Sequence, residues 1–463
     1  MLSLAPEFVL ALAVLTTAIA PRSQLDSKPG GAPENSPSVI VGEVHADRAL
    51  IQVRLAITPA EKDGGSESAP GFVALDISTQ PADGPMVTRR LGPVPAEADR
   101  DGIVRFVVSD LSLASTVHWQ VLHGVDADGL EAGLRGHFVT PPGRSLTAPV
   151  RVVVANCMNM YKFLRGTAQP EERSKGFPGL VAILDREPQT VVFAGDSVYY
   201  DHPRKSPATT RAAMRAKWHE LFAQPRMRTL LGSTATFWLK DDHDCRFDDC
   251  DMTGDQLPSS TLGVAMFREQ VPVVAASAAD APTWRRVRLS RDLEIWMTEG
   301  RDHRSPNKME DGPDKTLWGA EQRAWLQRTL LSSDATFRVL VSPTPLVGPD
   351  DARKTDNHTN HGGFRHEGDA FHRWAMEHKL PDEGFFVVCG DRHWKYHAEH
   401  PSGVEEYSCG ALVRANSRRG RAPGIQRART RTGWFVSYGH RTNPVAGLLS
   451  STWRVTRVAP DCP

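Results

Sequence analysis

The chain has 463 residues, which at about 100–200 residues per domain corresponds to two domains, possibly three. It contains 40% apolar and 24% charged residues, as in ordinary globular proteins, and its six cysteines are too few for a disulfide scaffold. Basic and acidic residues number 55 each, so no net charge steers the chain toward nucleic acid or an anionic membrane, and no nucleic-acid-binding module is expected.

The N-terminus contains a candidate signal peptide. Phe8–Ala20 is an apolar run that ends in the small-x-small pattern Ala18-Ile19-Ala20, which predicts a leader over residues 1–20 and export to the periplasm or the extracellular space. The absence of Lys and Arg from Met1–Glu7 is unusual for a signal peptide, and a misassigned start or a buried N-terminal helix is the alternative. No later segment reaches the ~18 apolar residues of a membrane span.

The next two segments differ sharply in composition. Residues 21–37 are rich in Pro, Gly, Ser and charge, which is typical of a disordered linker. Residues 38–142 contain short runs with a period of two, separated by turn clusters such as Asp63-Gly64-Gly65, and this pattern predicts a small β-sandwich. Its predicted strands include residues 49–55, 104–108, 117–122 and 136–140.

From residue 150 onward, strands alternate with helices. Strong β runs at 150–155, 190–194 and 385–389 are interspersed with helical patterns at 209–222 and 318–331. Such alternation predicts a layered α/β domain over residues 150–463.

Metal-binding residue types follow the ends of all three predicted strands. Cys157 follows the 150–155 run, and its thiol is either a soft metal ligand or a small core residue. Asp196 follows the 190–194 run after Gly195, and Tyr199 lies three residues further on, near enough to reach the same ion. A simple turn is the alternative for this Gly-Asp pair.

The third strand end carries Asp391 and His393 after Cys389 and Gly390. A carboxylate and an imidazole two residues apart suit a metal ion, whereas a turn aspartate and a surface histidine are the alternative. Because ligand sites of α/β sheets lie outside the carboxyl ends of the strands, these residues are expected to meet.

An unusually dense ionisable cluster, Asp241-Asp242-His243-Asp244, follows the apolar run Phe237-Trp238-Leu239. Packing three carboxylates and an imidazole this closely is electrostatically costly unless a cation is present. The cluster therefore indicates a metal site, with a solvated acidic loop as the alternative.

Taken in order, these motifs resemble the alkaline phosphatase D (PhoD-like) family of the calcineurin-like metallophosphoesterases. The general calcineurin-like signature runs Asp-x-His, Gly-Asp, Gly-Asn-His-Asp/Glu and Gly-His-x-His. In this chain Cys157 replaces the first motif, Asp241–Asp244 the third and Gly390–His393 the last, which are the substitutions of the alkaline phosphatase D family.

Further matches extend the resemblance to about residues 38–415. Arg301–Pro306 is similar to the family's Arg-x-x-Arg segment, and Gly319–Leu326 is similar to its Gly-x-x-Gln-x-x-Trp-Leu helix. The resemblance implies a layered β-sandwich metallophosphoesterase domain of αββα architecture, preceded by a fibronectin- or Ig-like β-sandwich.

The family also implies a mixed metal centre and a hydrolytic activity on small-molecule or polymeric phosphate esters. Fe3+ would be held by Cys157, Asp196, Tyr199 and His393, and Ca2+ by the bridging Asp196 together with Asp242 and Asp391. Thiolate, phenolate and imidazole ligands suit iron, and oxygen ligands suit calcium.

The resemblance also implies catalytic roles for two residues. His243 would protonate the leaving alkoxide or donate a hydrogen bond to the phosphate, and Arg301 would contact a non-bridging phosphate oxygen. The competing hypotheses are a non-catalytic extracellular binding protein on a phosphatase-like scaffold and a redox or structural iron protein.

Two features match nothing in the family pattern. The segment Arg414–Arg431 is rich in arginine and is either a solvated loop or a flap that attracts anions. Cys245 and Cys250 are close enough in sequence to pair, but are equally compatible with free thiols.

Overall fold

The structure is a computed structural model that describes residues 37–55, 58–59, 66–67, 71–80, 84–278, 280–348, 354–360, 362–418 and 435–437. The predicted leader and almost all of the predicted linker lie outside the described residues, as does most of the arginine-rich segment after residue 418. Within the described part of the chain, no helix is long and apolar enough to cross a membrane.

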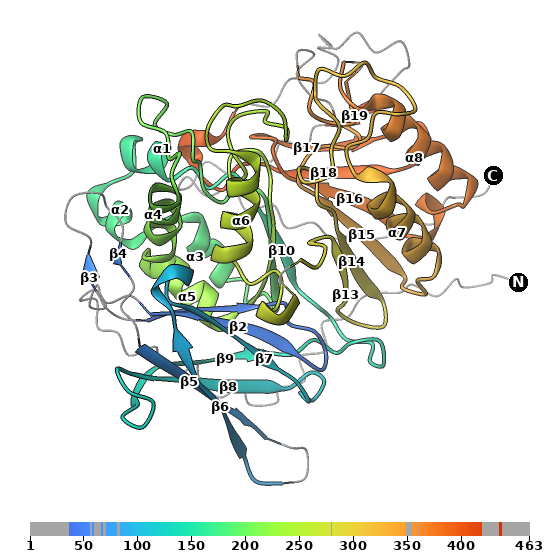
Figure 1. The fold of residues 1–463 in the computed structure, drawn as a ribbon. Helices are drawn as coiled ribbons and strands as arrows, with labels where there is room; N and C mark the ends of the chain where they lie inside the picture. The colour runs from blue at the N-terminus through green and yellow to red at the C-terminus, as the bar shows by residue number, and fades with distance from the viewer. Residues whose placement is uncertain are drawn as a thin grey trace, which may run out of the picture.

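Two large sheets lie face to face at the centre of the molecule (Figure 1). The six-stranded sheet has the order β10 (Val152–Ala155), β11 (Thr190–Ala194), β12 (Ala235–Leu239), β1 (Ser38–Gly42), β2 (Ala49–Arg54) and β7 (Ile103–Val108). The seven-stranded sheet has the order β13 (Arg285–Arg288), β14 (Leu293–Met297), β15 (Phe337–Ser342), β16 (Phe385–Cys389), β18 (Glu405–Cys409), β17 (Lys395–Glu399) and β19 (Phe435–Ser437).

Apolar side chains from both sheets form the layer between them. Val192 and Phe237 of the first sheet pack in one cluster with Ile295 and Val341 of the second. Strands buried on both faces carry continuous runs of β-branched and aromatic residues, which is why β11 and β16 were recognisable from sequence.

Helices cover the outer faces of the two sheets. The six-stranded sheet packs against α1 (Met160–Arg165), α3 (Gly179–Leu184), α4 (Arg211–Phe222), α5 (Pro225–Ser233) and α6 (Ser260–Gln270). The short helix α2 (Pro170–Lys175) contacts α5. The seven-stranded sheet packs against α7 (Gly319–Leu331) and α8 (Arg365–Glu377). Four short 3-10 turns complete the described elements: η1 (Ala98–Arg100), η2 (Ala276–Ala278), η3 (Pro381–Glu383) and η4 (Arg414–Asn416). The predicted layered αββα architecture is confirmed.

The predicted N-terminal β-sandwich is also present. Its outer sheet has the order β6 (Val87–Ala96), β5 (Gly71–Thr79), β8 (Thr116–Gly124) and β9 (Glu131–Val139), and a small hairpin joins β3 (Thr58–Pro59) to β4 (Ser66–Glu67). The opposite sheet of the sandwich consists of β1, β2 and β7, and one apolar core fills the space between them.

The sandwich shares a sheet with the layered domain, a connection that the sequence did not predict. β1 runs parallel to β12, with Gly42 opposite Thr236. The Glu43 amide donates to the Thr236 carbonyl at 3.0 Å, and the Thr236 hydroxyl donates to the Val41 carbonyl at 2.8 Å. The six-stranded sheet is therefore continuous across the predicted boundary at residues 142–150.

A buried polar group fastens the sandwich to the helices. Asp101, which follows η1, accepts two hydrogen bonds from Arg54 of β2, at 2.9 and 3.0 Å. It also accepts from His219 of α4 at 2.7 Å and from Gln270 of α6 at 2.8 Å. Asp101 is only 3% exposed, so its charge depends on these partners rather than on water.

Replacing Asp101 with Asn should lower the free energy of unfolding by about 3–5 kcal/mol at pH 7, because Arg54 would lose the buried carboxylate to which it donates two hydrogen bonds. Asn tolerates the left-handed backbone at this position, where φ is 58°. Urea denaturation of the variant and of Asp99→Asn, which alters an exposed neighbour, measures the difference. Equal midpoints for the two variants would contradict the prediction.

The same carboxylate should make stability sensitive to acid. Burial raises the pKa of Asp101, but hydrogen bonds from His219 and Arg54 outweigh it and hold the pKa well below its usual value. A carboxylate whose pKa is lower in the folded than in the unfolded protein stabilises the fold at pH values above its unfolded pKa of about 3.9. This stabilisation is lost as the pH falls toward the folded pKa. Wild type should therefore lose more stability below pH 4 than Asp101→Asn does.

Candidate metal centre and active site

The carboxyl ends of strands from both sheets meet at one edge of the layered domain. A glycine makes the approach possible: a Cβ atom at Gly390, after β16, would lie 2.2 Å from the Ala194 carbonyl oxygen at the end of β11. Such a contact is sterically forbidden, so only glycine lets these two strand ends come this close. The residues that follow β16 are thereby brought beside those that follow β11.

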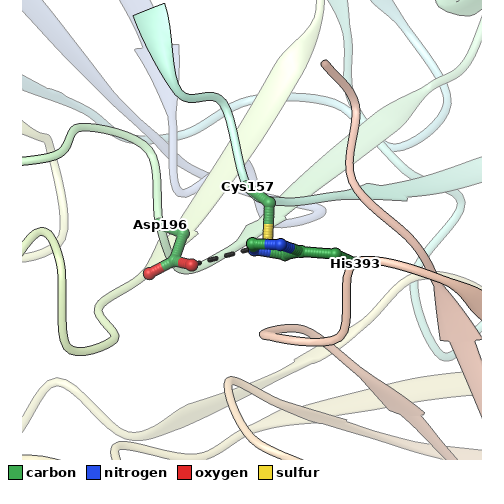
Figure 2. A group of neighbouring side chains, drawn as sticks. All are labelled: Cys157, Asp196 and His393. Carbon is green, nitrogen blue, oxygen red and sulfur yellow. Dashed lines mark hydrogen bonds between the residues drawn. The ribbon is translucent and has the colours of Figure 1, made fainter. Parts of the chain in front are cut away.

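The first group of candidate ligands is buried at this edge. Ligand atoms of Cys157, Asp196 and His393 all lie within 4.8 Å of one another (Figure 2). The Cys157 sulfur lies 3.4 Å from Asp196 Oδ2, and the Tyr199 hydroxyl donates to the same oxygen at 3.0 Å. The structure therefore brings together the four residues that the sequence proposed for iron.

Backbone conformation helps to aim these side chains. Cys157, Asp196 and Asp391 have φ values of 55°, 56° and 57°, the left-handed region that non-glycine residues seldom adopt. Each such residue costs on the order of 1 kcal/mol, a cost that is characteristic of functional sites. Each strand thus ends in a sharp turn at its candidate ligand.

Asp196 also belongs to two further groups. Asp242 and His243 offer ligand atoms within 4.8 Å of it, and so do Asp241 and Asp391. Asp242 and Asp391 are the residues that the sequence assigned to calcium, and both lie next to Asp196. The sequence prediction had left Asp241 out of the ligand set, although it stands in the same acidic motif.

His243 pairs with a carboxylate that sequence reasoning missed. Its Nδ1 lies 2.8 Å from Asp201 Oδ1, and its ring lies 4.1 Å from the Tyr199 ring, centroid to centroid. Its Nε2 faces Asp248, whose carboxylate is 3.8 Å away and half exposed. Asp201 comes two residues after Tyr199, but only the folded chain places it beside His243.

Arg301 is placed differently from its predicted role. It is completely buried, and its Nε donates to Asp241 Oδ1 at 2.8 Å. Its other nitrogens donate to the Cys250 carbonyl at 2.7 Å and to Asp356 at 3.2 Å. The guanidinium is therefore buried and bonded to Asp241, Asp356 and the Cys250 carbonyl, so that it supports the acidic motif.

The loop after the acidic motif adds charges that the sequence did not assign to the ligand set. Asp249 forms a group of candidate ligands with Asp242 and Asp248, and Lys354 forms an ion pair with Asp249. In the same loop, the buried thiols of Cys245 and Cys250 are not joined in a disulfide, and the Cys250 thiol donates to the Asp242 carbonyl at 3.5 Å.

The carboxylates of the site repel one another strongly. Burial raises the pKa of Asp196 well above its usual value, and the carboxylate of Asp242 raises it further. Burial likewise raises the pKa of Asp241 to about 6 and that of Asp244 to about 7. Only a nearby positive charge allows such a cluster to be fully ionised at neutral pH.

Unsatisfied buried atoms indicate where positive charge fits. Among the described residues, Asp196 Oδ1, Asp241 Oδ2, Asp356 Oδ1 and His393 Nδ1 have no hydrogen-bond partner. Buried polar atoms are almost always satisfied, so lone pairs left open at one site fit cation binding. The donor set, with a thiol, a phenol, an imidazole and carboxylates, suits a transition metal beside a harder cation.

The pKa shifts of the thiol and the phenol also fit a bound cation. Burial raises the pKa of Cys157 and of Tyr199 well above their usual values, and the Asp196 carboxylate raises both further. A bound cation reverses this effect, because it favours thiolate and phenolate as ligands.

Comparison with known proteins agrees with this geometry. Residues 154–414, which include the candidate ligands described above, match the model of the PhoD-like phosphatase family. The chain belongs to the PhoD-like phosphatase family. Membership and the clustered ligands together support metal-dependent hydrolysis of phosphate esters as its activity. No curated protein matches the sequence.

Solved structures of PhoD-like and related phosphatases share the fold. A structure of PhoD superimposes with a TM-score of 0.65 at 15% identity, covering 82% of this chain and 77% of that chain. A purple acid phosphatase from yellow lupin (Lupinus luteus) seeds superimposes with a TM-score of 0.57 at 13% identity, covering 87% of this chain and 68% of that chain. At these identities the likeness concerns the fold alone.

Proposed function

We propose that the chain is an exported phosphoesterase with a mixed Fe3+ and Ca2+ centre. Cys157, Asp196, Tyr199 and His393 would hold the iron, and Asp196, Asp242 and Asp391 would face calcium. The proposal rests on the observation that a thiol, a phenol, an imidazole and a carboxylate meet at one buried point. Asp241 is added as a candidate calcium ligand because it groups with Asp196 and Asp391.

When bound, the cations would supply positive charge that offsets the charge developing on the phosphoryl oxygens. The protein's own contribution is a positioned proton. Asp201 accepts from Nδ1 of His243, so the proton on Nε2 is directed toward the half-exposed Asp248, and we place the leaving-group oxygen on that side. His243 would give that proton to the departing alkoxide.

Charge at His243 supports this role. Burial lowers the pKa of His243, but the carboxylates of Asp242, Asp196 and Asp201 outweigh it and raise the pKa well above its usual value. Cations at Asp196 and Asp242 would cancel much of that attraction, which leaves Asp201 as the charge that keeps the imidazole protonated.

Arg301 would act through Asp241. Its buried guanidinium holds one oxygen of Asp241 and leaves the other without a partner among the described residues. We assign it a positioning role in place of the direct phosphate contact expected from its motif. Lysine could not reproduce this role, since it lacks the planar set of donors that reaches three partners at once.

The test is elemental analysis of the purified protein together with hydrolysis of p-nitrophenyl phosphate, with and without a chelator. Iron and calcium with chelator-sensitive hydrolysis are expected. Iron without hydrolysis would favour a binding or redox protein. Absence of both metals, with an unreactive Cys157, would overturn the proposed centre.

Parallel assays with p-nitrophenyl phosphate and bis(p-nitrophenyl) phosphate would establish the ester class. Both release the same chromophore, so the ratio of their kcat/KM values reports only the preference for one or two ester bonds. Metal-stripped protein is the control, and it should hydrolyse neither substrate.

A further inference from the structure

The start of the arginine-rich segment lies against the proposed iron ligands. Asn416, the last residue of η4, is 2% exposed. Its side-chain nitrogen donates to the Tyr199 hydroxyl oxygen at 2.9 Å and lies 3.4 Å from Nε2 of His393. This amide therefore touches two of the four proposed iron ligands from outside the ligand set.

A lysine fixes which way the amide points. Nζ of Lys162 donates to Oδ1 of Asn416 at 2.7 Å. An ammonium group only donates hydrogen bonds, so it must face the amide oxygen, and the amide nitrogen must then face Tyr199. The Lys162 backbone amide is itself held by the side chain of Asn159, two residues after Cys157.

The backbone around Asn416 is bonded to the loops that carry the ligands. The Leu412 amide donates to the Asn156 carbonyl at 3.0 Å, beside Cys157. The Arg418 amide donates to the His393 carbonyl at 2.8 Å. Asn416 is thus held on both sides by the segments whose side chains it contacts, which is the arrangement of an outer residue that orients metal ligands.

We propose that Asn416, oriented by Lys162, is a positioning residue that donates a hydrogen bond to the phenolate oxygen of Tyr199 when Fe3+ is bound. The inference rests on the proposed ferric centre. A phenolate has no proton to give, so Tyr199 would lose its hydrogen bond to Asp196 and keep the one that it accepts from Asn416.

This hydrogen bond has a spectroscopic consequence. Donation to an anionic oxygen is charge-assisted and withdraws electron density from the phenolate. It should therefore raise the energy needed to transfer an electron from the phenolate to Fe3+. The wavelength of that charge-transfer absorption reports the hydrogen bond independently of turnover.

The experiment compares visible absorption of iron-loaded wild type, Asn416→Ala and Lys162→Met, with iron content measured for each. Asn416→Ala should keep its iron and absorb at longer wavelength than wild type. Lys162→Met should shift the band less far in the same direction, since its amide nitrogen is still present but no longer fixed. Lys175→Met, on the exposed surface of α2, is the matched control and should leave the band unmoved.

Other outcomes would overturn the inference in distinguishable ways. An unmoved band in iron-loaded Asn416→Ala would remove Asn416 from its role while leaving the ferric centre intact. A wild-type protein without iron or a phenolate band would refute the ferric centre, and the inference with it. If Asn416→Ala does not fold, Lys162→Met decides alone, and an unmoved band there would contradict the proposed orientation.

Discussion

Asp196→Asn should lower kcat for phosphate ester hydrolysis by more than about 1,000-fold, because stabilisation of transition-state charge by metal ions is worth several kcal/mol. Asp196 belongs to three of the groups of candidate ligands, so its replacement affects both proposed metals at once. An amide can offer one neutral oxygen but cannot bridge two cations as a carboxylate does. Measured iron and calcium contents should fall together with kcat.

A stability measurement separates loss of the centre from loss of the fold. Burial and neighbouring carboxylates raise the pKa of Asp196, so the metal-free protein gains nothing from its charge. Metal-free Asp196→Asn should therefore have a Tm at least as high as that of metal-free wild type. Asp185→Asn, at an exposed position after α3, is the control and should retain activity and metals. An Asp196→Asn enzyme with more than a tenth of wild-type activity would contradict the bridging role.

His243→Ala should lower kcat by about 100- to 10,000-fold, the usual contribution of a general acid, with metal content retained. The size of the loss should depend on the leaving group. p-Nitrophenolate departs readily without a proton, whereas an alkoxide does not, so an alkyl phosphate should suffer the larger loss. The measurement is kcat for a series of esters whose leaving groups span a range of pKa.

Two further variants sharpen this test. Asp201→Asn should show a smaller defect with the same dependence on the leaving group, because it removes only the partner of Nδ1. His366→Ala, exposed on α8, should show none. Loss that is the same for all leaving groups would indicate that His243 binds phosphate rather than delivering a proton. Full activity of His243→Ala would remove it from the reaction altogether.

The sequence predicted three strands of the layered domain, at residues 150–155, 190–194 and 385–389, because buried strands have a distinctive composition. β11 and β16 occupy the predicted residues, Thr190–Ala194 and Phe385–Cys389. The pairing of β1 with β12 was not predictable in this way, because it joins segments far apart in the chain and leaves no local pattern. The change of composition near residue 142 therefore predicted two separate domains, whereas one sheet contains strands from both sides of that boundary.

The site residues likewise fall into those that a local sequence pattern marks and those that only long-range packing brings into place. Cys157, Asp196 and Asp391 were identified because each directly follows a buried strand. Asp201 and Asn416 come into place only through long-range packing, and no local spacing marks them. Arg301 shows a third case, in which the motif located the residue but the direction of its side chain depended on partners elsewhere in the sequence, Asp241 and Asp356.

Through the shared sheet, the N-terminal strands support a strand that leads into the candidate site. Because β1 covers the side of β12 that would otherwise be open, its removal would leave β12 as an edge strand with unpaired amides and carbonyls. β12 runs directly into Asp241–Asp244, so fraying at that edge would reach the acidic motif within a few residues. The sandwich thus supports, along one edge, the strand that leads into the acidic motif, and a truncated protein beginning after residue 142 would lack this support.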